Sequence, residues 1–221
     1  MSKAKKVVIL GGSGFLGQAL CQAAVIEGFT VISISRSGQP SEDRLTAKES
    51  ASSITWVAAD IFTTTDWHIY LQDAFAVIDL IGIIKEQPKK EITYSKFIVK
   101  AAKIIGVASA QLPSLQHFIF LSANAGPYRY MQAKQEAESL LINLPLPLTI
   151  VRPGLLVGRD RPSSIRAKWA LNTLAKLPLI GNLTQAIKPI DVQLVAKKIV
   201  QILDSPKPLT TRVIGIEQLT Q

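Results

Sequence analysis

Short apolar, β-branched runs alternate along the chain with longer segments rich in alanine and leucine. This alternation is typical of parallel β-α-β units, because strands covered on both faces are apolar throughout and helices connect them. Strands are predicted at Val7–Leu10, Phe29–Ser35, Ile54–Ala58, Ala76–Ile81, His117–Ser122, Leu148–Arg152 and Arg212–Glu217. Helices are predicted at Gly14–Glu27, closed by Gly28, at about Glu91–Ile105 with Gly106 near its end, at Arg129–Leu141 and at Asp191–Leu203.

The chain beyond Gly154 follows this rhythm less regularly. A helix is predicted at Ser163–Leu177, but the region of about 155–221 is too short for a separate core. No Ser/Gly/Pro-rich linker divides the 221 residues. The sequence therefore predicts one domain over residues 1–221, of the α/β class: a Rossmann-type doubly wound parallel sheet with helices on both faces and a small C-terminal cap.

Composition narrows the class of protein. Apolar residues make up 48% and charged residues 19%, as in a compact globular chain. Cys21 is the sole cysteine, which excludes an internal disulfide and a metal site built on several thiolates. Val7–Leu10 is too short for the apolar core of a signal peptide, and the apolar stretch Ala74–Ile84 contains Asp79. We expect a soluble intracellular protein, in the cytoplasm or an organelle matrix, without a membrane anchor.

The net charge of +9 favours anionic partners. Its basic residues are scattered, and aromatic residues make up only 6%, so a nucleic-acid platform is not expected. Within the predicted helix at Ser163–Leu177, Ile165 and Trp169 lie away from the apolar face, among cations. We interpret these two side chains as half-buried residues of a lid. The alternative is that they contact a lipid surface or a quinone.

A glycine-rich turn follows the first predicted strand. Gly11, Gly14 and Gly17 have the spacing Gly-x-x-Gly-x-x-Gly, and Gly12 in place of Gly11 gives Gly-x-Gly-x-x-Gly. In a strand-turn-helix, the first glycine permits a sharp turn, the middle one a close approach to a pyrophosphate, and the last one close helix packing. The helix N-terminus then presents N–H groups to phosphate. We predict a dinucleotide site here.

The ends of the second and third strands select among dinucleotides. An acidic residue after the second strand would favour NAD(H) by holding the ribose 2′-hydroxyl. This chain has Ser35, Arg36 and Ser37 instead, which suit a 2′-phosphate and place NADP(H) ahead of NAD(H). Arg36 as a simple solvent-facing residue is the alternative. Asp60 is predicted to accept a hydrogen bond from the adenine amine or, alternatively, to cap a helix that begins near Thr63.

These motifs as a set resemble the atypical branch of the short-chain dehydrogenase/reductase superfamily. The matching segments are Gly11–Gly17, Ser33–Gly38, Ala59–Ile61, Leu80–Gly82, Leu121–Ala123 and Arg152–Gly154. Within that branch the chain is most similar to proteins related to the accessory NAD(P)-binding subunit of respiratory complex I, together with a protein associated with coenzyme Q synthesis and plastid homologues. Such a resemblance implies tight dinucleotide binding, and some members of this group are structural rather than catalytic.

The resemblance also implies particular site residues. Cofactor contacts are expected from Gly11, Ser13, Gly14, Phe15, Leu16, Gly17, Ser35, Arg36, Ser37, Asp60, Ile61, Leu80, Ile81, Gly82, Lys134, Pro153 and Gly154. The Tyr-x-x-x-Lys pair of the family matches Tyr130 and Lys134, which lie on one helical face. It implies that Tyr130 exchanges the proton, that Lys134 binds ribose and lowers the phenol pKa, and that Ser122 orients the substrate carbonyl. The short interval between Ser122 and Tyr130 and the competing phenol of Tyr128 depart from the catalytic pattern.

Three functions follow from these observations. The first is an NADP(H)-dependent oxidoreductase acting on an unidentified carbonyl or quinone-like compound. A second is a non-catalytic dinucleotide-binding protein that assists assembly of a respiratory or quinone-synthesis complex or senses redox state. The third is a peripheral membrane or nucleic-acid binder that uses the positive charge.

Overall fold

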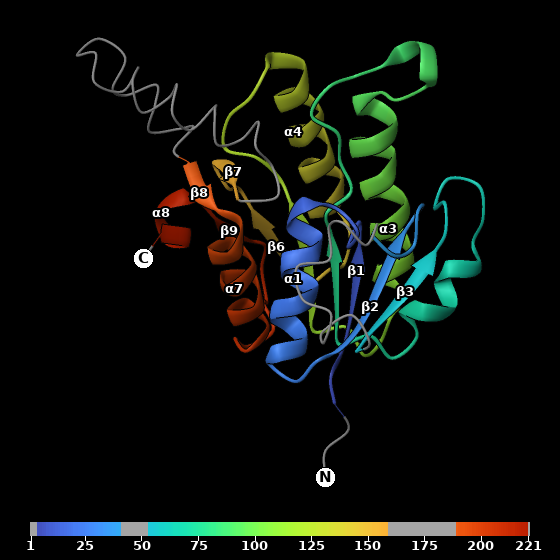
Figure 1. Ribbon diagram of the computed structural model, residues 1–221, viewed down its shortest axis with the longest axis vertical. Coiled ribbons are helices and arrows are strands. Elements are labelled where there is room, and N and C mark those ends of the chain that lie inside the picture. The colour runs from blue at the N-terminus through green and yellow to red at the C-terminus, as the bar shows by residue number, and fades with distance from the viewer. Residues whose placement is uncertain (1–3, 41–52, 159–188, 221) are drawn as a thin grey trace.

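The computed structural model describes residues 4–40, 53–158 and 189–220 (Figure 1). Its strands are β1 (Lys6–Leu10), β2 (Thr30–Ser35), β3 (Ile54–Ala58), β4 (Ala76–Asp79), β5 (His117–Leu121), β6 (Leu148–Val151), β7 (Leu155–Val157), β8 (Pro189–Asp191) and β9 (Arg212–Ile214). The helices are α1 (Phe15–Ile26), α3 (Ala101–Ala110), α4 (Tyr128–Ile142), α7 (Val192–Leu203) and α8 (Ile216–Thr220), with the 3-10 turns η2 (Asp66–Leu71) and η3 (Pro88–Lys90) and the π-helical turn η4 (Ser95–Lys100).

Seven parallel strands form the central sheet, in the order β3-β2-β1-β4-β5-β6-β9. The chain winds outward from β1 to β3 on one side and then from β4 to β9 on the other, so its direction reverses between β1 and β4. Ligands of such sheets bind at the carboxyl ends of the strands beside this reversal. The predicted Rossmann-type, doubly wound α/β class is confirmed.

Helices cover both faces of the sheet (Figure 1). Residues of β1 alternate between the faces, because successive side chains of a strand point in opposite directions. Ile9 packs with α1 and α7 in one apolar cluster, and Val8 packs with α3 and α4 in the other. Both side chains are fully buried. The β1 backbone is therefore fixed from both sides, which positions the turn that follows it.

The predicted helix at about Glu91–Ile105 differs from the observed structure at both ends. Glu91 has a positive φ of 54° and ends η3, while the helical segment begins with η4 at Ser95. Gly106 lies inside α3 rather than near its end. A Cβ atom at Gly106 would lie 2.6 Å from Cδ2 of Leu141 in α4, so the glycine permits close packing of two helices.

The C-terminal region contributes to the main sheet as well as lying beside it. Helix α7 packs against α1, and its Asp191 N-cap accepts a hydrogen bond from the Gln193 N–H. The predicted last strand is too long: β9 ends at Ile214, and Glu217 lies in α8. Strands β7 and β8 form a separate pair that the sequence pattern did not predict. The predicted helix at Ser163–Leu177 lies outside the described residues, and the cap remains a prediction.

Candidate functional site

The glycine turn leaves β1 at the reversal of the sheet. Gly11 adopts a positive φ of 86°, a conformation that favours glycine, and its N–H donates to the Ile34 carbonyl at 2.8 Å. A Cβ atom on Gly11 would lie 3.3 Å from the carbonyl carbon of Leu80, which follows β4. The turn and the segment after β4 therefore lie against each other at the edge where a ligand is expected.

Close packing of α1 against this turn depends on Gly17. A Cβ atom there would lie 2.6 Å from the Cα and carbonyl oxygen of Gly12, a backbone contact that no side-chain rotation relieves. Gly14 caps the helix without a side-chain hydrogen bond, and the first turn contains no acidic residue. The positive end of the α1 dipole is thus available to an anion, as a pyrophosphate site requires.

Two small buried side chains, those of Ser33 and Cys21, lie beneath the glycine turn. A Cβ on Gly12 would lie 2.9 Å from Cβ of Ser33 and 3.1 Å from Sγ of Cys21. Cys21 is fully buried, and this burial raises the pKa of its thiol to about 12. The thiol is therefore a packing group at neutral pH rather than a nucleophile.

Two adjoining cavities open at the carboxyl edge of the sheet. The first, which we call the β2–β3 cavity, has a volume of about 570 Å³. Its lining includes Gly11, Ser13, Gly14, Ser35, Arg36, Ser37, Asp60, Ile61, Leu80, Ile81 and Gly82, all predicted as cofactor contacts. The second, the β5–β6 cavity, has a volume of about 420 Å³. Its lining includes Gly11, Gly14, Phe15, Leu16, Gly17, Leu80, Gly82, Ser122, Tyr130, Lys134, Pro153 and Gly154.

Arg36 and two serines form one end of the β2–β3 cavity. The exposed Arg36 guanidinium lies 4.9 Å from the centroid of the Phe97 ring, a cation–π arrangement. Ser37 Oγ donates to Ser13 Oγ at 3.2 Å, which links the end of β2 to the glycine turn. Phe97 belongs to the π-helical turn η4, and the sequence pattern gave no signal for its role in placing Arg36.

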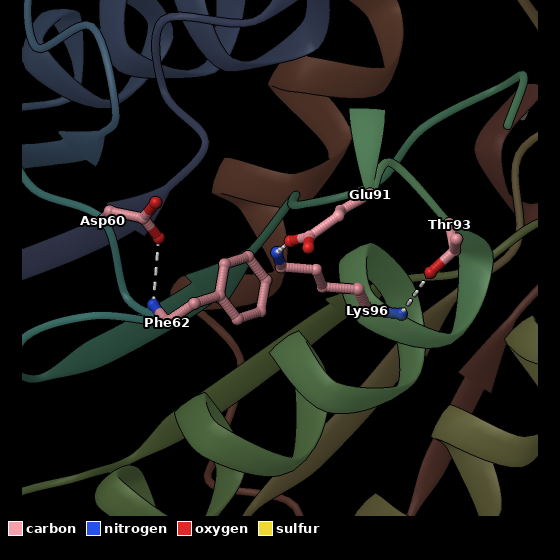
Figure 2. Close-up of polar contacts among 5 residues, drawn as sticks. All are labelled: Asp60, Phe62, Glu91, Thr93 and Lys96. Carbon is pink, nitrogen blue, oxygen red and sulfur yellow. Dashed lines mark hydrogen bonds and ion pairs between the residues drawn. The ribbon is translucent and has the colours of Figure 1, made fainter. Parts of the chain in front are cut away.

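Asp60 caps a turn rather than a helix beginning near Thr63, and its side chain also lines the β2–β3 cavity. Its Oδ1 accepts a hydrogen bond from the Phe62 N–H at 3.0 Å (Figure 2). Asp60 therefore caps the turn after β3, whereas the nearest helical segment, η2, begins only at Asp66. The same half-buried side chain lines the β2–β3 cavity, where a carboxylate can accept a hydrogen bond from a base.

Phe62 forms the floor between this turn and η4. Its ring lies 5.2 Å from the Phe97 ring in an edge-on arrangement and 5.8 Å from Lys96 Nζ. Figure 2 shows Lys96 directed toward Glu91, with an Nζ–Oε2 distance of 3.1 Å, while its backbone N–H donates to Thr93 Oγ1. These contacts hold η4, which carries Phe97, against the turn after β3.

The β5–β6 cavity brings together the three predicted catalytic residues. Ser122 follows β5 and is 3% exposed, and its hydroxyl has no hydrogen-bond partner among the described residues. Tyr130 and Lys134 reach the cavity from the first two turns of α4. Tyr128, the competing phenol, is 77% exposed and is not part of the lining. The structure thus distinguishes between the two phenols, as the sequence could not.

Tyr130 differs from prediction in its acidity. Its ring packs edge-on against Tyr94, with 5.6 Å between centroids. Burial and the neighbouring Tyr94 raise the pKa of the Tyr130 phenol to about 12, whereas the resemblance implied a lowered pKa. The reason is that Lys134 Nζ lies 5.9 Å from the Tyr130 ring centroid and donates a hydrogen bond to the Leu121 carbonyl. At this position the cation does not outweigh burial of the phenol.

A buried set of charges surrounds Lys134. Asp79, at the end of β4, is 1% exposed, and Glu138, one turn further along α4, is 5% exposed. Glu138 accepts hydrogen bonds from two nitrogens of Arg152, which follows β6. In the sequence, Asp79 is evident only as a charge inside an apolar stretch, and neither acid was predicted as a site residue. The i, i+4 spacing of Lys134 and Glu138 was the available signal.

A larger groove of about 1160 Å³ lies between η2 and α3. Ile61 is the only predicted site residue in its lining, which also contains threonines, apolar side chains, two lysines, His68 and Gln111. The groove contains none of the glycine turn or of the Ser122, Tyr130 and Lys134 set. The candidate site is therefore the pair of smaller cavities.

The chain belongs to the NAD(P)H-binding family, whose model matches residues 11–206. A chloroplastic protein of unknown function from Arabidopsis thaliana, At1g32220, is 34% identical over 74% of this chain and 54% of its own length. MIOREX complex component 2 of Saccharomyces cerevisiae is 27% identical over 91% of this chain and 94% of its own. The mitochondrial NADH dehydrogenase [ubiquinone] 1 alpha subcomplex subunit 9 of A. thaliana is 25% identical over 88% and 49%. This chain spans about half the length of the two plant relatives.

Solved structures share the fold. UDP-glucuronic acid 4-epimerase from Bacillus cereus, in complex with NAD, has a TM-score of 0.72 at 20% identity, over 96% of this chain and 76% of its own. Vestitone reductase from alfalfa has a TM-score of 0.69 at 15% identity over the same shares. A short-chain dehydrogenase/reductase superfamily protein from Agrobacterium tumefaciens has a TM-score of 0.67. The short-chain dehydrogenase/reductase-like, NAD(P)-binding Rossmann fold is thereby confirmed.

Across the described residues, no helix is both long enough and apolar enough to cross a membrane.

Proposed function

We propose that this protein is an NADP(H)-dependent oxidoreductase of the atypical short-chain class, acting on a carbonyl or quinone-like compound. The observation that carries this proposal is the convergence of Ser122, Tyr130 and Lys134 in one cavity with the glycine turn. The two cavities adjoin, since Gly11, Gly14 and Leu80 line both of them. A dinucleotide laid across both would place its reactive end beside the three side chains.

The residues fit such a cofactor. Gly11 and Gly17 occupy positions where side chains would fill the turn, and α1 directs its positive end toward a pyrophosphate. Bound NADP(H) would supply hydride. The Tyr130 phenol, protonated at neutral pH, would donate a proton to a carbonyl oxygen, and the unpaired Ser122 hydroxyl would donate a hydrogen bond to that oxygen. Lys134 would bind the ribose hydroxyls and stabilise the phenolate that forms.

The remaining wall of the β5–β6 cavity is apolar and supports an apolar substrate. Phe15, Ile83, Ile84, Leu155 and Leu156 line it, with Ala123 and Pro127. A hydrophobic wall with a few convergent polar groups is the usual composition of a small-molecule site.

Replacement of Tyr130 tests the chemistry. NADPH oxidation with menadione and phenanthrenequinone would be measured for wild type, Tyr130→Phe and the matched control Tyr128→Phe. Loss of the general acid should lower turnover by about 10² to 10⁴-fold in Tyr130→Phe, while the exposed Tyr128 should be replaceable without loss. Equal turnover in wild type and Tyr130→Phe would contradict the assigned role of the phenol.

Arg36 is proposed as the selector of NADP(H) over NAD(H). A guanidinium at the end of β2 offers paired hydrogen-bond donors to a 2′-phosphate. Asp60 is the one acidic residue among the described residues that line this cavity. NADPH and NADH affinities would be compared for wild type, Arg36→Ala and Lys197→Ala, an exposed control on α7. Arg36→Ala should weaken NADPH binding about tenfold or more and leave NADH binding unchanged. Equal affinities of wild type for both cofactors would discard the selector role.

A second function is favoured by two observations: the raised pKa of the Tyr130 phenol and the names of two relatives, which describe components of a MIOREX complex and of a respiratory dehydrogenase. In this reading the protein binds dinucleotide without turnover and contributes to a complex in an organelle or at a membrane surface. NADPH binding without oxidation of any quinone or carbonyl, with the same co-purifying proteins for wild type and Tyr130→Phe, would favour it.

A further inference from the structure

Lys134 is an almost fully buried cation whose contacts are well defined. Its side chain is 3% exposed, and Nζ donates a hydrogen bond of 2.6 Å to the Leu121 carbonyl at the end of β5. Nζ also lies 4.8 Å from the Phe120 ring centroid. A buried ammonium requires a nearby negative charge, because neither a carbonyl dipole nor a ring face replaces the lost hydration of a full charge.

Two acids act electrostatically on Lys134, and one of them is already paired. Glu138, on α4, accepts hydrogen bonds from Nε and Nη2 of Arg152, so its charge is matched by a guanidinium. Tyr130, also on α4, carries no charge at neutral pH, since its phenol pKa of about 12 lies far above 7. The other acid is Asp79, which approaches Lys134 from the end of β4.

Asp79 has the features of an unmatched counter-charge. It is 1% exposed, and its Oδ1 accepts a hydrogen bond from the Ile81 N–H at 2.9 Å. Its Oδ2 is buried and has no hydrogen-bond partner among the described residues. In the sheet, Asp79 pairs in register with Phe120, the residue whose ring lies under Lys134 Nζ.

We propose that Asp79, which belongs to neither the glycine turn nor the Ser122, Tyr130 and Lys134 set, is a positioning residue that keeps Lys134 charged and directed toward the bound dinucleotide. The inference rests on the proposed function, since it deepens the role of Lys134 in the same site. The carboxyl end of β4, at the reversal of the sheet, would then have a second role besides lying against the phosphate-binding turn. Its Asp79 would hold Lys134, which is proposed to bind the ribose at the reactive end of the cofactor.

The electrostatics of the pair agree with this role. Burial lowers the pKa of Lys134, and the charges of Asp79 and Glu138 partly oppose that effect. Burial likewise raises the pKa of Asp79, and the Ile81 N–H and the Lys134 charge oppose it. Removing the Asp79 charge should therefore lower the Lys134 pKa further, toward neutral pH. At that pH a part of the molecules would then carry a neutral amine.

The pH dependence of NADPH affinity tests the proposal. Dissociation constants would be measured between about pH 6 and pH 9.5 for wild type and Asp79→Asn. Wild-type affinity should fall as pH rises through the Lys134 pKa. If that pKa drops by about one unit, Asp79→Asn should bind roughly five- to tenfold more weakly between about pH 8 and 9 and within about twofold of wild type near pH 6. An unchanged midpoint, or a uniform loss at every pH, would overturn the proposal.

Lys134→Arg supplies the matched control, since a guanidinium remains charged across this range. Its NADPH affinity should lose the alkaline fall, and adding Asp79→Asn in that background should not restore one. If the double variant shows the same midpoint shift as Asp79→Asn alone, Asp79 acts through another group and the proposal fails.

A measurement without cofactor separates this inference from the proposed function. The Nζ signal of Lys134 would be followed by NMR in ¹⁵N-lysine-labelled protein and assigned with Lys134→Arg. The midpoint should be lower in Asp79→Asn than in wild type, whether or not the protein binds NADPH. If Asp79→Asn does not fold, the wild-type Lys134 signal should still shift a second time as Asp79 titrates. Absence of that coupled shift would overturn the inference, whereas absence of NADPH binding alone would overturn only the proposed function.

Discussion

Burial changes the charge state of several single side chains in this protein. His117, at the start of β5, is 1% exposed and packs 5.3 Å from the Phe75 ring. Burial lowers its pKa to about 4, and the nearby Arg212 and Lys5 act in the same direction. His117 therefore remains neutral in the folded protein at pH values where the unfolded chain takes up a proton.

This difference predicts an acid-dependent loss of stability. Between about pH 6.5 and pH 4 the unfolded state binds more protons at this position, so the free energy of unfolding falls as pH falls. Comparing wild type with His117→Gln cancels the contributions of other groups. Relative to His117→Gln, wild type should lose about 2 to 3 kcal/mol over this range, measured by urea denaturation at each pH. A difference that does not vary with pH would show that His117 titrates normally.

The residues that form the candidate site were predicted from sequence more completely than the surroundings of their side chains. The glycine spacing and the Tyr130–Lys134 spacing are local, so both could be recognised before the fold was known. The acidity of Tyr130 depends on Tyr94 and on burial, which come from residues distant in sequence. Asp79 likewise became a candidate only when β4 and β5 were paired. Spacing predicts which groups share a helix face, but it does not predict their neighbours across strands.

At the scale of elements, α1 packs so closely against the turn after β1 that almost no space remains for an added side chain. Gly17→Ala should destabilise the protein by about 1 to 3 kcal/mol and weaken NADPH binding strongly, because the added Cβ meets the Gly12 backbone. Chemical denaturation and NADPH titration would measure both effects. Gly215→Ala is the matched control, since the nearest atom to its added Cβ is 4.0 Å away. Its stability should stay within about 0.5 kcal/mol of wild type. Equal behaviour of both variants would contradict the packing argument.

The central strands and main helices were predicted well, because their apolar periodicity is continuous. The errors occur where tertiary packing overrides local preference. Glycine often ends a helix, yet α3 continues through Gly106, where the missing side chain leaves room for Leu141 of α4. The pairing of β7 with β8 joins segments more than 30 residues apart in sequence, and each is only three residues long. Such short strands carry too little pattern to be predicted.

At the scale of the whole molecule, the two cavities span the reversal of the sheet. Their linings come from the ends of β1 to β6, so a ligand in both would connect the two halves of the fold. At about 100 times its dissociation constant, NADPH should add about 2.7 kcal/mol of stability. For a chain of this size the melting temperature should rise by about 5 to 11 °C.

Adenosine 2′,5′-bisphosphate serves as the control ligand, since it can occupy only the β2–β3 cavity. At the same free concentration, differential scanning calorimetry should show a smaller rise with this half-ligand than with NADPH, because contacts in the second cavity lower the dissociation constant of NADPH. No rise with NADPH at any concentration would contradict dinucleotide binding across the two cavities.

The buried thiol beneath the glycine turn can report local opening of the structure around it. Cys21 is the only cysteine in the chain, and it lies between α1 and the sheet with its pKa raised to about 12. A thiol reagent can modify it only in molecules whose α1 has momentarily separated from the sheet. The rate at which the reagent modifies Cys21 therefore reports how often the phosphate-binding turn opens. A bound dinucleotide should lower that rate.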